Sequence, residues 1–182
     1  MKLYSYFRSS AAYRVRIALN LKGLEYETVP VHLLKDGGQQ HSDAYKALNP
    51  TELIPTLVDG ELAIGQSMAI LEYLEEAYPE PALLPPDPAG RARVRAIAQS
   101  IACDIHPLNN LRVLKHLKRG LGVDDATKDE WYRHWINVGL TSVEALLAGN
   151  PATGRYCHGD QVTLADVVLV PQVFNARRYD CD

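Results

Sequence analysis

The spacing of apolar residues changes along this chain. Strand-like and helix-like patterns alternate in the first 80 residues, and only helix-like spacing is found in the remainder. Two short runs rich in strand-forming residues, 2–6 and 26–31, flank a stretch from Ser10 to Lys22 in which apolar residues recur three and four positions apart. This recurrence is typical of an amphipathic helix, and Gly23 is a suitable residue to end one. The pattern therefore predicts a strand, a helix and a second strand.

A hairpin and a further helix are predicted downstream of a loop. The strand-like runs 56–58 and 62–64 flank Asp59-Gly60, a dipeptide favoured in two-residue hairpin turns. Ser67 then opens an apolar-periodic stretch that ends near Ala77. A strand–helix–strand order requires parallel pairing and the hairpin adds an antiparallel edge, so we expect a mixed sheet.

A proline-rich segment marks the boundary between two predicted domains. Residues 78–88 contain five prolines, which break helices and strands and favour a stiff connector. Beyond it only helical periodicity remains, over residues 91–105, 110–119, 129–147 and 164–178. Thr163 and Asp166 resemble a capping box before the last of these helices. We expect an α/β domain in residues 1–80, a linker in 81–88 and an all-helical domain in 89–182.

Composition narrows the class of protein without indicating its chemistry. The chain has 182 residues, 47% of them apolar, which excludes a disordered chain. Its formal charge of −3 argues against nucleic-acid binding. No apolar run approaches the roughly 18 residues of a membrane span, and residues 1–10 lack the apolar core of a signal peptide. Cys103, Cys157 and Cys181 are too widely spaced for a zinc site or a disulfide framework, so we expect a cytoplasmic protein without a metal.

The dipeptide Ser9-Ser10 lies where a strand gives way to a helix. A hydroxyl here either simply caps the helix or, together with the positive end of the helix dipole, stabilises a thiolate. No cysteine of the chain is near these serines in sequence, so such a thiol would belong to a ligand.

Two further features each allow a structural and a functional interpretation. Pro55 enters a strand either as an edge residue or through a cis bond, which would turn the Ile54 N–H and C=O towards a peptide-like ligand. Gln66 and Ser67 open the next helix, either as a cap or as a binding site for a carboxylate.

Longer runs of residues carry a more specific resemblance. In the first half these are YSYFRSS at 4–10, YRVRIAL at 13–19, KDGGQQ at 35–40, LNP at 48–50, IPTL at 54–57 and QSMAILEYL at 66–74. In the second half they are PL at 107–108, NL at 110–111, RYC at 155–157, GD at 159–160, TLAD at 163–166 and LVPQ at 169–172. With these runs the chain resembles the zeta class of glutathione transferases over essentially its whole length. The resemblance implies the glutathione transferase fold, in which an α/β thioredoxin-like N-terminal domain with a mixed sheet precedes an all-α C-terminal domain, and it implies glutathione as the cofactor.

The resemblance also implies roles for individual residues. Ser9 matches the serine that hydrogen-bonds the glutathione sulfur, and Ser10 matches its neighbour at the helix N-terminus. Arg8 and Arg178 match basic residues that face an acidic substrate, in keeping with the fit between guanidinium and carboxylate groups. Further positions that match glutathione contacts are Gln40, Ile54, Gln66, Ser67, His106, Asn110 and Arg112. Whether Gln40 or its neighbour His41 makes the contact is left open.

The activity implied by the resemblance is cis–trans isomerisation of a maleyl keto acid, maleylacetoacetate, to its fumaryl isomer in the catabolism of tyrosine, phenylalanine and other aromatic compounds. The glutathione thiolate would add to the cis double bond, rotation would follow, and expulsion of the thiolate would regenerate glutathione. The class typically has a cysteine directly after the two serines, where this chain has Ala11. That departure makes maleylpyruvate an alternative substrate.

Other expectations follow from the resemblance alone. A general glutathione transferase acting on electrophiles and a non-catalytic dimerisation module are further alternatives. The expected partners are the substrate, glutathione and a second copy of the chain, with no nucleic acid and no membrane. The helical domain of the family usually continues for a few tens of residues past the position of Asp182, so we expect the given sequence to lack the last helices.

Overall fold

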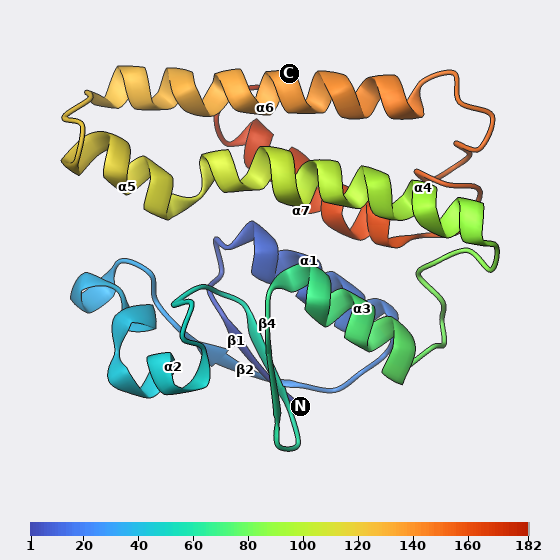
Figure 1. The fold of residues 1–182 in the computed structure, drawn as a ribbon, viewed down its shortest axis with the longest axis horizontal. Helices are drawn as coiled ribbons and strands as arrows, with labels where there is room; N and C mark the ends of the chain where they lie inside the picture. The colour runs from blue at the N-terminus through green and yellow to red at the C-terminus, as the bar shows by residue number, and fades with distance from the viewer. Residues whose placement is uncertain (182) are drawn as a thin grey trace. The chain divides into compact units, whose positions relative to one another are not determined.

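The computed structural model describes residues 1–181, and the chain folds as two compact units, Met1–Ala82 and Leu83–Asp182. The first unit holds a four-stranded sheet with the strand order β2-β1-β3-β4 (Figure 1). Its elements are β1 (Lys2–Ser5), α1 (Ser10–Leu21), β2 (Glu27–Pro30), the 3-10 turns η1 (Lys35–Gly37) and η2 (Gln39–His41), α2 (Asp43–Leu48), β3 (Thr56–Asp59), β4 (Leu62–Gly65) and α3 (Ser67–Ala77).

The sheet is mixed, as the sequence predicts. β1 pairs with β2 in parallel and with β3 antiparallel, so that Leu3 lies opposite both Thr28 and Leu57. The turn of the β3–β4 hairpin is one residue later than predicted, because Asp59 still pairs with Leu62. Gly60 then takes the first central position with a φ of 59°, a conformation that favours glycine.

The two faces of the sheet are covered by different helices. Tyr4 and Thr56 share one face, on which the Tyr45 hydroxyl of α2 lies 2.9 Å from Thr56 Oγ1. Leu3 and Leu57 point to the opposite face and are fully buried, like Ile70 of α3. α1 and α3 lie side by side in this unit (Figure 1). The sheet thus holds the start of α1 at the C-terminal end of β1.

The second unit is helical. Its elements are α4 (Pro88–Gln99), a π-helical turn η3 (Ser100–Ile105), a 3-10 turn η4 (His106–Asn109), α5 (Leu111–Arg119), α6 (Asp125–Leu147) and α7 (Leu164–Arg177). The buried core consists mainly of aliphatic residues of α4, η3, α6 and α7, among them Val94, Ile97, Ile101, Ile105, Ile136, Val167 and Val168.

Residues 91–105 do not form one continuous α-helix, contrary to the prediction. The helix widens to π geometry at Ser100, and Gly139 of α6 approaches it so closely that a Cβ there would lie 2.3 Å from Cγ1 of Ile105. Periodicity cannot reveal this widening, because it accompanies a tertiary contact. α6 also begins at Asp125 rather than Asp129, since Asp124 caps it by accepting from the N–H of Thr127 at 2.7 Å.

Part of the expected linker packs within the second unit. Leu83 and Leu84 are buried, and Leu83 O accepts a hydrogen bond of 2.8 Å from the N–H of Leu164. Cys157 and Thr163 both donate from their backbone N–H to Asp166, so the predicted capping box at Thr163 and Asp166 is confirmed. Within residues 1–181 no helix is both long and apolar enough to cross a membrane.

Candidate functional site

Ser9 caps α1 just beyond the end of β1. Its backbone is extended, with φ of −76° and ψ of 113°, and its Oγ accepts from the N–H of Ala12 at 3.1 Å. The hydroxyl proton of Ser9 is therefore free to be donated to another group, because Oγ acts only as an acceptor in this contact. Ser9 is half-buried and Ser10 buried. The cap and the functional role considered from the sequence are compatible with each other.

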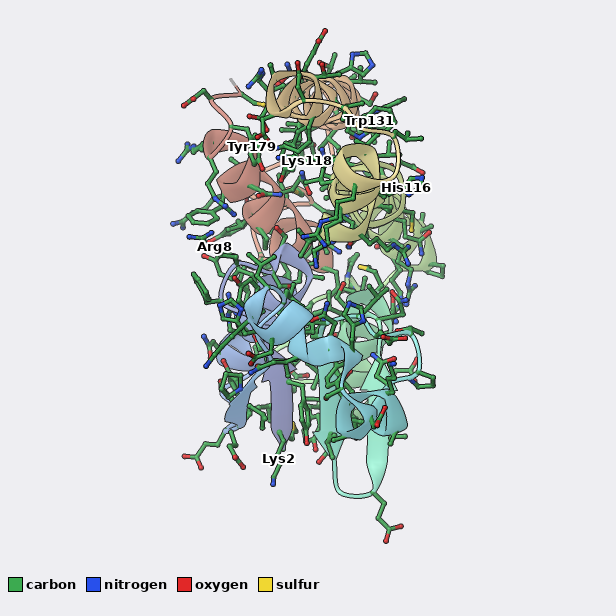
Figure 2. All side chains as sticks on the ribbon, turned by 90° about the vertical axis from the view of Figure 1, so that its left-hand side faces the viewer. Lys2, Arg8, His116, Lys118, Trp131 and Tyr179 are labelled. Carbon is green, nitrogen blue, oxygen red and sulfur yellow. The ribbon has the colours of Figure 1, made fainter. Side chains whose placement is uncertain are left out.

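Arg8 precedes this cap and is exposed. Its guanidinium lies 5.2 Å from the centre of the Phe7 ring, which is itself 68% exposed. Arg8 projects from the end of the first unit opposite to Lys2, which opens β1 (Figure 2). A cationic side chain with an exposed aromatic neighbour thus stands beside the N-terminus of α1.

A buried arginine joins the N-terminal part of α1 to the N-terminus of α3. Arg14 is 2% exposed, and its Nη1 donates to Ser67 Oγ at 3.1 Å. The structure therefore brings Ser9 and Ser67, two helix-opening serines far apart in the sequence, into one region of the first unit. Our sequence reasoning missed Arg14, although it falls four residues before Ala18 on the apolar face of the predicted helix.

Gln66 adopts a backbone conformation that is uncommon for a residue with a side chain. Its φ is 67° and its side chain is exposed and does not cap α3. Such conformations cost free energy and are enriched at ligand sites. Gln66 thus presents its amide at the helix start beside Ser67, where free backbone N–H groups favour an anion.

The segment before β3 is anchored next to Ile54, through the C=O of Leu53. The C=O of Leu53 accepts from Tyr45 Oη at 2.7 Å and from Asn49 Nδ2 at 3.0 Å. The Ile54–Pro55 peptide bond is cis, the second of the two alternatives considered from the sequence. Within residues 1–181 neither the N–H nor the C=O of Ile54 has a hydrogen-bond partner. These groups can therefore pair with the backbone of a peptide-like ligand.

Gln40 and His41 differ in their surroundings. Gln40 is 5% exposed, whereas the side chain of His41 is 51% exposed. The Nε2 atoms of the two residues lie 2.9 Å apart, and Nδ1 of His41 contacts the carboxylate of Glu52.

The remaining predicted residues belong to the second unit. His106 begins η4 directly after the π-helical turn, and Asn110 caps α5 by accepting from the N–H of Arg112 at 3.1 Å. Arg112 is exposed, and the exposed Arg178 caps the C-terminus of α7. Asn110 thus has a structural role that the sequence comparison did not indicate.

Tyr132 of α6 links η4 to the end of α7, a relationship that sequence reasoning missed. Its C=O accepts from Asn109 Nδ2 at 3.0 Å, and its ring stacks on Tyr179, the residue after Arg178. Burial raises the pKa of Tyr132, with the negative charge of a Tyr179 phenolate as a second cause. Within the second unit, this tyrosine therefore supports both the His106–Arg112 segment and Arg178.

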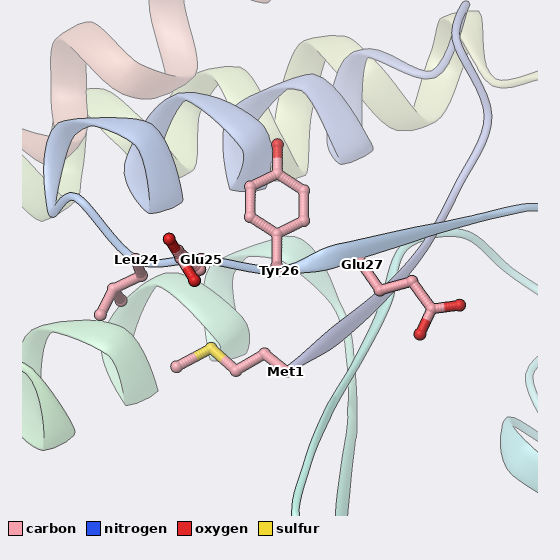
Figure 3. Close-up of a pocket in the computed structure, with 5 residues that line it drawn as sticks. All are labelled: Met1, Leu24, Glu25, Tyr26 and Glu27. Atoms are coloured by element: carbon pink, nitrogen blue, oxygen red, sulfur yellow. The ribbon is translucent and has the colours of Figure 1, made fainter.

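Other chemistry-bearing groups stand apart from these residues. Burial raises the pKa of the Cys157 thiol to about 12, so this cysteine is a poor nucleophile at neutral pH. Among residues 1–181 no group of three His, Cys, Asp or Glu side chains could hold a metal ion. A surface hollow lined by Met1 and residues 24–27 lies by the N-terminal end of β1 and includes none of the predicted site residues (Figure 3).

Comparison with known proteins identifies the family. Residues 3–82 match the family model described as glutathione S-transferase, N-terminal domain. The chain is 56% identical to a protein of Vibrio cholerae named probable maleylacetoacetate isomerase, over 99% of this chain and 83% of that protein. It is 53% identical to maleylpyruvate isomerase of Ralstonia sp, over 100% of this chain and 85% of that protein. Among solved structures, maleylacetoacetate isomerase of Methylobacterium extorquens AM1 with bound malonate and glutathione superposes with a TM-score of 0.96, at 42% identity over 100% of this chain and 85% of that one. The predicted fold class is thereby confirmed, and the chain belongs to the zeta class of the glutathione transferases.

Proposed function

We propose that this chain is a glutathione-dependent cis–trans isomerase that converts a maleyl keto acid, maleylacetoacetate, into its fumaryl isomer. The observation that carries the proposal is the Ser9 hydroxyl at the N-terminus of α1, where the first helical turn contains no cysteine. Relatives at 56% and 53% identity are named as isomerases of maleylacetoacetate and maleylpyruvate, and the structure from Methylobacterium extorquens contains glutathione.

The residues of the first unit fit glutathione, a tripeptide with two carboxylates, one amine and two amide N–H groups. The unpartnered N–H and C=O of Ile54 offer one donor and one acceptor to a peptide backbone. Gln66 and Ser67 at the start of α3 offer an amide, a hydroxyl and helix N–H groups to a carboxylate. Gln40 adds a buried amide.

Ser9 and Ser10 would act on the sulfur. Bound glutathione supplies the nucleophilic thiolate that adds reversibly to the double bond and so permits rotation. Ser9 donates a hydrogen bond from its hydroxyl to that sulfur, and the positive end of the α1 dipole lowers the free energy of the negative charge on the sulfur. Both effects favour the thiolate at neutral pH.

The basic residues would act on the substrate. Arg8, exposed before the cap of α1, and Arg178, exposed at the end of α7, offer permanently charged planar donors to the carboxylates of a dicarboxylic acid. His106, Asn110 and Arg112 are proposed as ligand contacts from the second unit. We further propose that the protein is a cytoplasmic homodimer in tyrosine and phenylalanine catabolism.

Maleylpyruvate is the second candidate substrate, and Ala11 favours it. The zeta class typically has cysteine at this position, and a relative at 53% identity is named maleylpyruvate isomerase.

An ultraviolet assay of both maleyl keto acids, with and without glutathione, tests the proposal. We expect turnover that depends on glutathione, with a higher kcat/KM for one of the two acids. Undiminished turnover without glutathione would refute the mechanism. Conjugation of model electrophiles at much higher efficiency than isomerisation would instead indicate a general transferase, and failure to bind immobilised glutathione a non-catalytic module.

A further inference from the structure

A chain of hydrogen bonds runs from Gln40 through His41 to Glu52. The Nε2 of an amide can only donate, so at the 2.9 Å contact the Nε2 of His41 must accept. A neutral imidazole that accepts at Nε2 carries its proton on Nδ1, and Nδ1 is the atom that faces the Glu52 carboxylate. One tautomer of His41 therefore satisfies both contacts.

This chain of contacts fixes which end of the Gln40 amide is held by the protein. The Nε2 of Gln40 is held by His41, while its Oε1 is buried and has no hydrogen-bond partner within residues 1–181. A buried carbonyl oxygen without a partner costs free energy, so within residues 1–181 the side-chain amide of Gln40 is held by hydrogen bonding at Nε2 alone.

The backbone beneath the amide limits its movement. A Cβ on Gly38 would lie 2.7 Å from Nε2 and 2.8 Å from Oε1 of Gln40, so the amide lies directly on this glycine. Gly38 also has a φ of 117°, a conformation that other residues rarely adopt. Gln40 is thus restrained by packing against Gly38 and by its hydrogen bond to His41.

Glu52 is in turn placed by its own backbone. Its φ is 56°, its N–H donates to Asn49 O at 3.0 Å, and its carboxylate lies 3.9 Å from Lys46 Nζ. Glu52 precedes Ile54 by two residues, so the same contact ties η2 to the segment that carries the unpartnered backbone groups.

We propose that His41 is a positioning residue for glutathione: it accepts from Nε2 of Gln40 and, through Glu52, ties that amide to the segment that carries the unpartnered backbone groups of Ile54. Glu52 sets the tautomer of His41 that this requires. The proposal rests on the proposed function, and it assigns the ligand contact to Gln40 and the orientation of that contact to His41.

The tautomer can be measured without any ligand. In the protein labelled with nitrogen-15 in its histidines, NMR near pH 8 should show His41 protonated at Nδ1 and not at Nε2. Glu52→Gln keeps an acceptor for that proton and should keep the tautomer, whereas Glu52→Ala should allow both tautomers. A proton on Nε2 of His41 in the unaltered protein would overturn the proposal.

Steady-state kinetics test whether His41 affects the KM for glutathione. Replacing His41 by Phe keeps a planar ring but removes the acceptor, and should raise the KM for glutathione about three- to tenfold with little change in kcat, as expected for one lost hydrogen bond. In a Gln40→Ala background the same replacement should have no further effect, because His41 acts through Gln40. His134→Phe, at another exposed histidine, is the matched control and should leave the KM unchanged.

The outcomes separate this proposal from the proposed function. If the unaltered protein does not bind glutathione, both fail. If it binds glutathione but His41→Phe leaves the KM unchanged, or its effect adds fully to that of Gln40→Ala, only the positioning role fails. Urea unfolding midpoints of all variants show whether an effect on KM reflects a loss of folding instead, and a KM rise that merely follows the midpoint also overturns the positioning role.

Discussion

Tyr132 and Tyr179 stack face to face, with their ring centres 3.6 Å apart and their planes inclined by 13°. Tyr179 directly follows Arg178, so this stack restrains the end of α7 against α6. The backbone of Tyr132 also accepts from Asn109, which precedes the Asn110 cap of α5. Two segments with predicted ligand contacts therefore depend on Tyr132, one through its ring and the other through its backbone.

Removing the ring of Tyr179 should weaken the binding of the substrate more than the binding of glutathione. We expect Tyr179→Ala to raise the KM for the keto acid severalfold, because Arg178 loses its restraint, and to leave the KM for glutathione nearly unchanged. Tyr179→Phe keeps the stack and serves as the control. Steady-state kinetics with each substrate varied in turn provide the measurement, and an equal rise in both KM values would contradict the prediction.

Two substitutions at Ser9 separate its structural role from its chemical role. Ser9→Ala should cost about 1 kcal/mol of stability through loss of the cap, whereas Ser9→Gly should cost only a few tenths. Both should lower turnover by at least tenfold, because both remove the hydroxyl that is proposed to stabilise the thiolate. Urea unfolding and the isomerase assay give the two quantities. Full turnover in Ser9→Gly would show that the hydroxyl has no chemical role.

The Asp166 carboxylate is expected to be a major contributor to the stability of the second unit. It accepts from the N–H of Cys157 at 2.9 Å and from both the N–H and the hydroxyl of Thr163 at 2.8 Å. Asp166→Ala should lower the free energy of unfolding by about 2–4 kcal/mol, since two buried backbone donors lose their partner. Asp166→Asn keeps one acceptor oxygen and should cost less. Chemical denaturation measures both, and equal losses would contradict this account.

The buried thiol of Cys157 should make stability fall at alkaline pH. Burial, with the nearby Asp166 as a second cause, raises its pKa from 9.0 to about 12. Below pH 9 the folded and unfolded states both keep the proton, whereas between pH 9 and about 12 only the unfolded state loses it, so rising pH favours unfolding. Urea midpoints should therefore fall more steeply with pH for the unaltered protein than for Cys157→Ala. Parallel curves would show that this thiol does not contribute.

The strands and most helices could be predicted because their causes are local. Runs of strand-forming residues identify β1 and β3, and the helical period with Gly23 at its end identifies α1. α2 was missed because its six residues are too few for a periodic pattern, although Ser42 caps it. The start of α6 was predicted four residues too late because the Asp124 cap was not considered.

The residues that hold the site together were harder to predict than those expected to contact the ligand. Ser9 and Ser67 are recognisable as helix openings, but the contact of Arg14 with Ser67, which joins α1 to the start of α3, spans 53 positions of sequence. The stack of Tyr132 on Tyr179 likewise depends on how α6 meets α7. Such partners are set by packing between distant segments, which a single sequence does not display.

Ala11 gives the proposed chemistry a consequence for oxidative damage. With no sulfur in the first turn of α1, the reactive thiol would belong to an exchangeable ligand instead of being built into the chain. An oxidised nucleophile would then leave the site by simple dissociation, so that an oxidant would reduce activity by depleting reduced glutathione rather than by permanently inactivating the enzyme.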